Sequence, residues 1–429
     1  MAWYNNNWKF RKKIVLNKSL ITKKSYNDFT FLFKTKDGEI VSNSRKDGKD
    51  IIFVDKNNNL LNFDIIKFDR KTSTIIANVN ININTSDEEI YFYIYYGNQN
   101  LEISLENKQE ANKLFSFVSH LSFNPYDNTI PLDKGPYTTI NKNGDFDIKY
   151  KNIIVPYSQS IGYGLEFLKE KFNSFTTPSA LDFTGSKTIA IEAWIKAKSV
   201  QDSYIINQGY LEYSQYQDFT LGIKKSKLLV RISTNAIYSY NILSNTTLNV
   251  NTLYHVAAIW KADSQILYIY INGILDKTVI IPGNFLDFYA KNNFTEIKTN
   301  IGNCAVNVNK YFSGIISEVR LSFDNNYNRD YILLYYLNAT NNNFYTINES
   351  ETSPELLSDI AWRNEYNDYE KRIKVFIKKD EIIGQETHHR FPFLLNLYTP
   401  YLNEASPHGN DLIITDKKGN RLPFERMFF

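Results

Sequence analysis

Alternating apolar and polar residues mark the N-terminal part of the chain as β-structure. Across Ile75–Asn84 the odd positions carry Ile, Ala or Val, and the even positions from Asn78 onward carry Asn. Successive side chains of a strand point to opposite faces, so this period of two predicts a strand with one buried and one solvent-exposed face. The stretch Phe29–Phe33, in which Phe alternates with Thr and Leu, predicts a second strand of the same kind.

Short runs of β-branched and aromatic residues continue to about residue 340, and such runs favour strands. Asn272-Gly273 separates two of them and predicts a type I′ hairpin, because both central residues of that turn need positive φ. The segment Arg329–Leu337 has apolar residues at helical spacing and predicts a helix. The predicted strands are Lys9–Val15, Phe29–Phe33, Ile51–Val54, Ile75–Asn84, Ile90–Tyr96, Ile189–Ile195, Phe219–Ile223, Leu228–Ile232, Tyr254–Trp260, Ile266–Ile271, Ile274–Ile280 and Phe312–Phe323.

Changes in composition predict three domains joined by two linkers. Residues 1–100 form a small β domain, and the polar, helix-tolerant residues 101–114 form a linker. Residues 115–340 form a larger β domain. Residues 341–361, rich in Asn, Thr, Ser and Glu, form the second linker, and residues 362–429 form the last unit. The predicted fold class is all-β, with several β-sandwiches in one chain.

The last unit repeats the first. The motif FRKKI at Phe10–Ile14 is matched by YEKRI at Tyr369–Ile373, and DGKD at Asp47–Asp50 is matched by HGND at His408–Asp411. This partial copy lacks counterparts of the strands Ile75–Asn84 and Ile90–Tyr96. An incomplete sheet exposes unpaired edges, so we expect the missing strands to come from another chain or from sequence beyond Phe429.

Composition and charge exclude several classes of protein. A net charge of +3 is too balanced to require nucleic acid or anionic lipid as a partner. Cys304 is the single cysteine, so no internal disulfide and no cysteine-pair zinc site can form. The N-terminus lacks the pattern of a secretory signal peptide, and no apolar run reaches membrane-spanning length. The 52 Asn, 31 Tyr and 29 Phe residues are typical of an AT-rich genome.

The first unit resembles a small uncharacterised β domain that opens with a Trp-Tyr-Arg-Lys-type strand and closes with Tyr-Tyr-Gly-Asn, here Tyr95-Tyr96-Gly97-Asn98. The middle region resembles a laminin-G-type concanavalin A-like sandwich. The motifs that carry this second resemblance are His120-Leu121, Ile191–Ile195, Tyr254–Ala257, Tyr270–Gly273 and Phe312–Arg320. Together the two resemblances imply a surface, adhesion or phage virion protein, and they imply no defined ligand.

Catalytic carboxylates are expected in pairs if the sandwich is a glycoside hydrolase. On one strand they would stand two or four residues apart, facing the same way. Glu192 and Glu318 each stand alone among apolar residues of their strands. We therefore predict no catalytic residue and no enzyme, with a polysaccharide-degrading enzyme as the alternative from another class.

No metal site is marked by a cluster of ligands. His388 and His389 are adjacent and would point to opposite faces of a strand. Calcium at the rim of a sandwich is bound by carboxylate, amide and backbone oxygens. The candidate calcium ligands are Asp182, Asp218 and Asp263, and calcium is the one cofactor that the sequence suggests.

The start of the chain is basic and aromatic. Seven Lys and Arg residues precede the first acid, Asp28, with Trp and Tyr interleaved among them. This composition suits single-stranded nucleic acid, but it also suits a solvated strand face. The second copy carries Asp368, Glu370 and Asp380 in the same stretch, which favours the solvated face. We predict no nucleic-acid partner.

Glycan binding is the ligand hypothesis that the sequence favours. The stretch Gly209–Asp218 supplies Tyr210, Tyr213, Tyr216 and Asp218, which combine stacking rings with a hydrogen-bonding carboxylate. Such groups on a loop at the rim of a sandwich suit a sugar. An ordinary Tyr-rich loop without a ligand is the alternative.

The predicted function is that of a non-enzymatic structural or adhesive virion protein of a bacteriophage, with glycan binding by the central sandwich. Its expected partners are other virion proteins, copies of itself and host surface glycans, and its expected location is the virion, outside the cell after lysis. A bacterial cell-surface adhesin is the first alternative.

Overall fold

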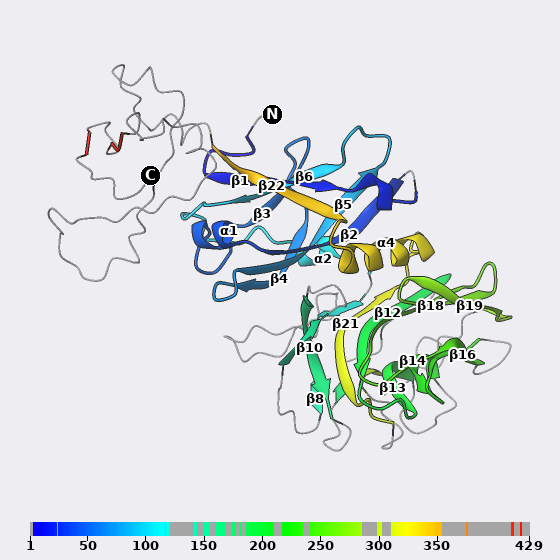
Figure 1. Cartoon of the computed structure of the whole chain (residues 1–429). Coiled ribbons are helices and arrows are strands. Elements are labelled where there is room, and N and C mark those ends of the chain that lie inside the picture. Colours follow the sequence, from blue (N-terminus) through cyan, green and yellow to red (C-terminus); the bar gives the residue numbers. More distant parts are fainter. Residues whose placement is uncertain are drawn as a thin grey trace. The chain divides into compact units, whose positions relative to one another are not determined.

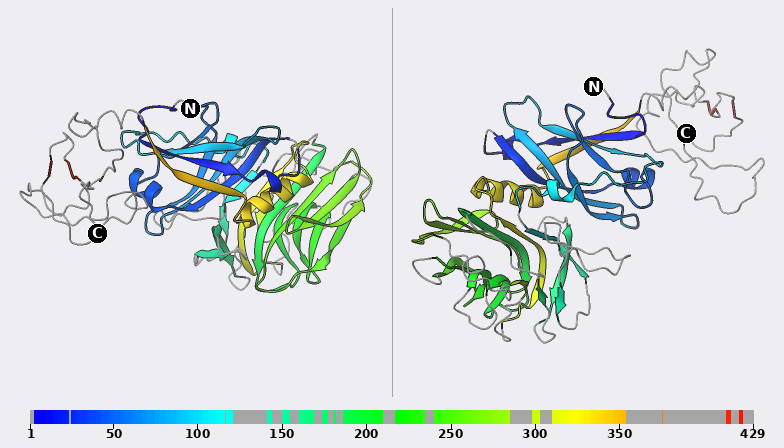
Figure 2. Two further views of the ribbon diagram at one scale, coloured as in Figure 1. Left: turned by 45° about the horizontal axis from the view of Figure 1, so that its top comes forward. Right: turned by 180° about the vertical axis from the view of Figure 1, so that it is seen from behind.

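The computed structural model describes residues 3–23, 25–115, 117–120, 141–143, 150–154, 160–168, 174–176, 181, 186–209, 217–234, 240–284, 298–302, 310–353, 375, 413–415 and 421–422. The chain divides into two compact units, Met1–Glu351 and Thr352–Phe429. Nearly all of the second unit, and with it nearly all of the predicted repeat over 362–429, lies outside the described residues. Figures 1 and 2 show the elements of the first unit.

The small domain consists of two antiparallel sheets that enclose an aromatic core. Phe31 of one sheet meets Phe92 of the other with ring centroids 5.2 Å apart. The first sheet has the order β22-β1-β6-β3 and the second β2-β5-β4. Their bounds are β1 Phe10–Leu16, β2 Ser25–Lys36, β3 Ile52–Asp55, β4 Phe63–Asp69, β5 Thr74–Asn84, β6 Tyr91–Tyr96 and β22 Tyr345–Thr352, with short helices η1 Lys18–Leu20, α1 Gly38–Asn43 and α2 Lys108–Ala111.

Strand β22 lies in the predicted linker over 341–361, and here the structure differs from the prediction. The strand pairs with β1, so it completes the small domain from a point in the chain after the sandwich (Figure 1). Its side chains are mostly half-buried or exposed, which explains why its composition resembled a linker. The sandwich is therefore an insertion between β6 and β22 of the small domain.

The predicted solvent-exposed face of β5 is buried over half its length. Asn78 and Asn80 are buried, whereas Asn82 and Asn84 are exposed. The Asn78 Nδ2 donates to Asn112 Oδ1 at 3.0 Å, and Asn80 Nδ2 donates to the Glu110 carbonyl at 2.9 Å. Helix α2, in the predicted linker over 101–114, thus covers this face with polar partners, and the amide side chains accommodate that burial.

The middle region is a sandwich of two antiparallel sheets. The first, here called sheet C, has the order β19-β18-β17-β12-β21-β10-β9, with β7 also paired to β21. The second, sheet D, has the order β16-β15-β14-β13-β20-β11-β8. Their bounds are β7 Phe117–His120, β8 Asn141–Asn143, β9 Tyr150–Ile154, β10 Ser160–Phe167, β11 Ser174–Thr176, β12 Thr188–Ala197, β13 Ser203–Gly209, β14 Gln217–Lys224, β15 Lys227–Ile232, β16 Tyr240–Thr247, β17 Leu253–Lys261, β18 Ile266–Ile271, β19 Ile274–Ile280, β20 Lys298–Ile301 and β21 Gly314–Ser322.

The hairpin prediction is confirmed at the turn between β18 and β19. Asn272 has φ 53° and Gly273 has φ 75°, as a type I′ turn requires. A Cβ at Gly273 would also lie 2.8 Å from the Cβ of Tyr336, so the helix beneath the turn leaves no room for a side chain.

The tryptophans of β12 and β17, Trp194 and Trp260, lie on opposite faces of sheet C. Trp260 belongs to the apolar core between the sheets and is fully buried. Trp194 is equally buried but on the outer face, where its ring stacks on Tyr336 at 6.0 Å. The cover on that face is helix α4 (Arg329–Thr340), which is three residues longer than predicted.

Helix α4 also closes an edge of the small domain. Among the strands that the structure describes, β2 pairs with β5 alone, so the backbone groups of its other edge need partners other than a strand. The Asn338 side chain accepts from Leu32 N at 2.6 Å and donates to Leu32 O at 3.1 Å. The Tyr345 hydroxyl bridges Lys34 N and O in the same way. Side chains from α4 and β22 therefore replace the missing neighbouring strand. No helix among the described residues is long and apolar enough to cross a membrane.

Candidate functional site

A row of polar residues crosses the outer face of sheet D at one level. The register pairs Asn207 with both Asn300 and Thr220, Thr220 with Arg231, and Arg231 with Asn241. Their neighbours along each strand point inward and form the apolar core, so the polar side chains share the outer face. Five strands, from β20 to β16, thus contribute one amide, hydroxyl or guanidinium group each.

Hydrogen bonds fix the side chains of this row. Asn207 Nδ2 donates to Thr220 Oγ1 at 2.8 Å, and Arg231 Nε donates to Asn241 Oδ1 at 2.7 Å. Asn207 and Thr220 are buried, Arg231 is half-buried and Asn241 is exposed. The row therefore passes from the interior to solvent, and its accessible end is Arg231 with Asn241.

An aromatic and apolar row runs beside the polar one. Tyr204 pairs with Gly222, which pairs with Leu229, and Leu243 packs against this cluster. A Cβ at Gly222 would lie 2.9 Å from Cδ1 of Tyr204, so glycine allows the ring to lie across the strand. The Lys310 ammonium stands 5.3 Å from the ring centroid. Tyr204 and Leu229 are buried, so the accessible part of these two rows consists of Arg231, Asn241 and the half-buried Leu243.

The predicted glycan residues Tyr210, Tyr213 and Tyr216 lie outside the described residues. In the sequence they fall between β13 and β14, and both of these strands contribute to the polar row. Asp218 is in β14, two residues before Thr220. The sequence missed Asn207, Thr220, Arg231 and Asn241 because each is a single polar residue of a different strand, and only the register between strands brings them together.

The calcium candidates are not brought together within the described part of the sandwich. Asp263 is exposed in the turn between β17 and β18, where its Oδ1 lies 3.2 Å from Lys187 Nζ. Asp182 lies outside the described residues. Among the residues that the structure describes, no group of three His, Cys, Asp or Glu side chains could hold a metal ion.

The two isolated acids, Glu192 and Glu318, meet around one arginine beneath α4. Arg320 Nη1 lies 3.2 Å from Glu192 Oε1, and Arg320 Nε donates to Glu318 Oε1. His255 Nε2 is 3.2 Å from Glu192 Oε2, and the Tyr335 ring lies 3.7 Å from the guanidinium carbon of Arg320. Glu192, Glu318, Arg320, His255 and Tyr335 are all at most 6% exposed. Pairing between β12, β17 and β21 brings these side chains together. An acid flanked by apolar residues in a predicted strand is a sequence signal for a buried carboxylate that needs a partner, and both Glu192 and Glu318 carry that signal.

Opposite charges within this cluster shift the pKa values of Glu192 and Arg320 so that both groups stay ionised. Burial raises the pKa of Glu192, but the hydrogen bond from His255 and the charge of Arg320 outweigh burial and hold that pKa below its usual value. Burial lowers the pKa of Arg320, but Glu318, Tyr335 and Glu192 together raise it. Glu192 is therefore held as a carboxylate beside Arg320, and Arg320 in turn contacts the Tyr335 ring of α4.

Two of the basic N-terminal residues, Arg11 and Lys12, form ion pairs with acidic residues of the same chain. Arg11 forms an ion pair with Glu351 of β22 at 2.6 Å and packs against the rings of Trp3 and Tyr93. Lys12 Nζ lies 2.7 Å from Asp37. Arg11 and Lys12 are both buried, so the expected solvated strand face is wrong at these two positions.

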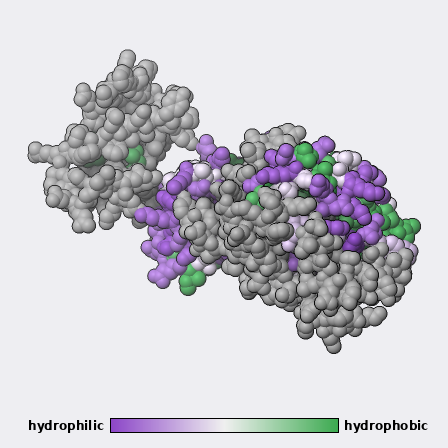
Figure 3. All heavy atoms as spheres, turned by 90° about the horizontal axis from the view of Figure 1, so that it is seen from below, coloured by the Kyte–Doolittle hydropathy of each residue, from purple (hydrophilic) through white to green (hydrophobic). Residues whose placement is uncertain are grey.

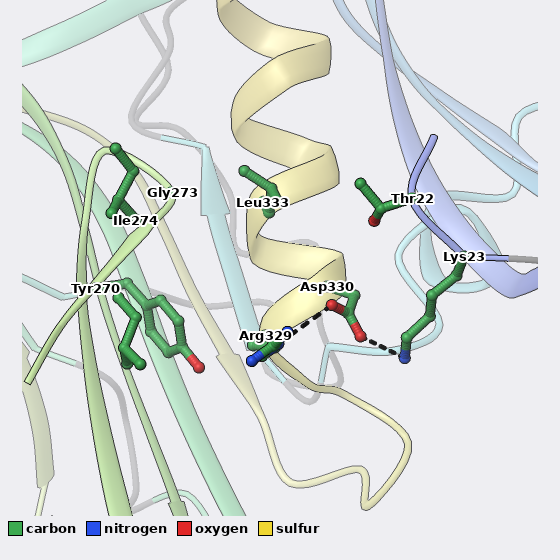
Figure 4. A pocket seen from close by; sticks show the side chains of 9 residues that line it. Thr22, Lys23, Tyr270, Gly273, Ile274, Arg329, Asp330 and Leu333 are labelled. Carbon is green, nitrogen blue, oxygen red and sulfur yellow. Dashed lines mark hydrogen bonds and ion pairs between the residues drawn. The ribbon is translucent and has the colours of Figure 1, made fainter. Parts of the chain in front are cut away.

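A pocket of about 580 Å³ lies between the β18–β19 hairpin, the first turns of α4 and the loop before β2 (Figure 4). Its walls are mainly apolar, and a chain of ion pairs crosses one side. Lys23 Nζ lies 2.6 Å from Asp330 Oδ2, and Arg329 Nε lies 3.4 Å from Asp330 Oδ1. The lining residues are Thr22, Lys23, Tyr270, Gly273, Ile274, Leu275, Arg329, Asp330 and Leu333.

Comparisons with known proteins agree with this architecture. The model of the concanavalin A-like lectin/glucanases superfamily matches residues 169–325. The model of a Domain of unknown function (DUF2341) matches residues 47–128. No curated protein matches the chain.

Similar solved structures include receptor-binding domains of botulinum neurotoxins and a domain of an arabinanase. The domain of mosaic serotype C/D is 13% identical, with 52% of this chain and 51% of that chain covered and a TM-score of 0.36. The serotype D domain is 13% identical, with 52% of each chain covered and a TM-score of 0.36. Domain 4 of an extracellular arabinanase from Geobacillus stearothermophilus, in complex with arabinotriose, is 14% identical, with 51% and 97% covered and a TM-score of 0.37.

The chain spans about half the length of the neurotoxin domains that it matches. The strands, the two-sheet core and the family models locate the domains in this sequence. The chain is thus a multidomain all-β protein in which a laminin-G-type concanavalin A-like domain, matched over residues 169–325, accompanies a small β domain of the DUF2341 family, matched over residues 47–128.

Proposed function

We propose that the chain is a non-enzymatic adhesive protein whose sandwich binds a glycan on the outer face of sheet D. The observation that carries this proposal is the polar row that ends at Arg231 and Asn241, beside the half-buried Leu243 of the same strand as Asn241. Sugars present hydroxyl groups around an apolar ring face, so they suit a surface with amide, hydroxyl and guanidinium groups next to apolar side chains. Tyr210, Tyr213 and Tyr216, which fall between β13 and β14 in the sequence, stay candidate glycan ligands in this proposal.

The absence of enzymatic activity is part of the proposal. Glu192 and Glu318 are buried on the other sheet, with Arg320 between them, and a hydrolase needs its acids beside the substrate. A polysaccharide-degrading enzyme stays the alternative, and a test for released reducing sugars decides between the two. No product from any polysaccharide that the protein binds is the expected result.

We further propose that the protein is part of a bacteriophage virion, with other virion proteins or copies of itself as partners. The resemblance of its two kinds of domain to surface and virion proteins supports this setting. A bacterial cell-surface adhesin is the alternative. Immunogold labelling of purified particles and of host cells separates the two, because only a virion protein labels the particle.

A glycan array tests the binding site directly. Wild type, Arg231→Ala and Asn241→Ala would be applied at equal concentrations, with Thr247→Ala as the matched control. Thr247 is exposed on the same strand but lies outside the row. We expect loss of at least about tenfold in apparent affinity for the two row variants and no change for the control. Equal binding by all four proteins would place the site elsewhere, and no binding by folded wild type would reject glycan recognition.

A further inference from the structure

The pocket between the β18–β19 hairpin and α4 has an unusually exposed apolar wall. Ile274 is 70% exposed and Leu275 is 44% exposed, although both are large apolar residues. Figure 3 shows apolar side chains in small groups on a mostly hydrophilic described surface. Large apolar side chains that stand beside a cavity and stay in solvent are typical of a surface that binds a partner.

The charged side of the pocket favours an acidic partner. Lys23 and Arg329 are two positive charges against the one negative charge of Asp330. Figure 4 shows the Lys23 and Asp330 side chains directed toward each other, with Arg329 on the other side of Asp330. The Arg329 side chain is 70% exposed, and its contact with Asp330 uses Nε. A guanidinium in this position can bind a carboxylate through its Nη groups.

The complement of this pocket lies in the chain itself, in the segment LEISLE at residues 101–106. Ile103 is 77% exposed, more than any other large apolar residue among the described ones. The exposed Glu102 precedes it directly. An apolar side chain next to a carboxylate is what the pocket would accept, with Ile103 against Ile274, Leu275 and Leu333 and Glu102 on Arg329.

We propose that two copies of this chain associate head to tail, with the 101–106 segment of one copy in the α4–hairpin pocket of the next. The segment does not occupy the pocket of its own chain, because Ile103 is exposed to solvent there. The two contact surfaces are different parts of the molecule, so the contact is heterologous and leaves one pocket and one segment free at the ends. Repetition of the contact produces open linear assemblies or closed rings.

Sedimentation velocity over a range of protein concentrations tests this association. Ile103→Ser removes the apolar side chain of the segment, and Ile274→Asp and Arg329→Glu alter the pocket. All three positions are at least 70% exposed, so the variants are expected to fold, and circular dichroism verifies that they do. Ile280→Ser is the matched control, because Ile280 is 69% exposed on the same strand as Ile274 but does not line the pocket.

We expect wild type and the control to associate as concentration rises, and each of the three variants to associate at least about tenfold more weakly. A 1:1 mixture of Ile103→Ser and Ile274→Asp has one intact pocket and one intact segment. It should therefore form complexes of two chains and nothing larger. A synthetic peptide of residues 99–107 should compete with wild-type association, and the same peptide with Ser at position 103 should not.

Three results would overturn the proposal. One is a wild type that stays monomeric at its highest soluble concentration. Another is association that persists unchanged in Ile103→Ser and Arg329→Glu, which would assign the contact to a different surface, such as the C-terminal unit. The third is a variant mixture that forms species larger than two chains.

Discussion

The buried contact between Lys34 of the small domain and the end of α4 can be tested by substitution and by pH. The Lys34 side chain is buried, at 8% exposure for the residue, and its ammonium donates a hydrogen bond to the carbonyl of Ala339 in the last turn of the helix. Burial lowers the pKa of Lys34 from 10.5 to about 8, because the charged form loses its hydration. The substitution Lys34→Met keeps the apolar stem and removes the charge.

The direction of the pH dependence follows from the two pKa values. The unfolded chain binds a proton at Lys34 up to about pH 10.5, whereas the folded chain releases it from about pH 8. Between these values the unfolded state holds more protons, so the free energy of unfolding rises with pH, and below pH 8 it is independent of this group. The difference between 10.5 and about 8 corresponds to about 3 kcal/mol. The Ala339 carbonyl and the negative end of the helix favour the ammonium, so this figure is an upper estimate.

Urea unfolding of wild type and Lys34→Met from pH 7 to pH 10.5 measures the effect. Groups common to both proteins cancel in the difference, and we expect wild type to gain up to about 3 kcal/mol relative to Lys34→Met across the window. Lys36→Met is the control, because Lys36 is exposed on the same strand, and its difference from wild type should stay flat. A flat difference for Lys34→Met, or one that falls with pH, would refute the reasoning and show that Ala339 and the helix end fully replace the lost hydration.

Three further predictions concern the sandwich. Trp194→Ala and Trp260→Ala should each lower the free energy of unfolding by about 3–5 kcal/mol, since both rings are buried, and a loss below 1 kcal/mol measured by denaturation would contradict the packing. Arg320→Met should destabilise by about 3–5 kcal/mol because Glu192 and Glu318 stay buried without their partner, and unchanged stability would mean that they take up protons instead. Replacing Tyr210, Tyr213 and Tyr216 together with Ala should abolish glycan binding on an array and leave the Tm nearly unchanged, and intact binding would move the site away from the loop.

Local patterns predicted half of the helices and strands in the described part of the chain. The alternation across Ile75–Asn84 predicted β5, the Asn272-Gly273 dipeptide predicted the hairpin, and the apolar spacing after Arg329 predicted α4. These signals depend on residues within one element, because side-chain period and backbone φ are local properties. The all-β, multidomain architecture followed from them.

Partners distant in sequence could not be predicted in this way. Nothing in residues 345–352 indicates pairing with β1, because that strand buries little of its surface and is held by an edge more than 300 residues earlier. Asn78 and Asn80 stand at alternating positions that predict a solvent-exposed face, yet the residues of α2 and its C-terminal end cover them.

The candidate site shows the same division between sequence and tertiary structure. The sequence predicted strands at Phe219–Ile223 and Leu228–Ile232, within β14 and β15, but it predicted neither β13 nor β16. The register between strands decided that Asn207, Thr220, Arg231 and Asn241 stand in one row, and strand pairing decided that Glu192 and Glu318 share Arg320. The physical reason is that periodicity specifies the direction of a side chain, whereas its neighbours across a sheet depend on which strands pair and at what offset.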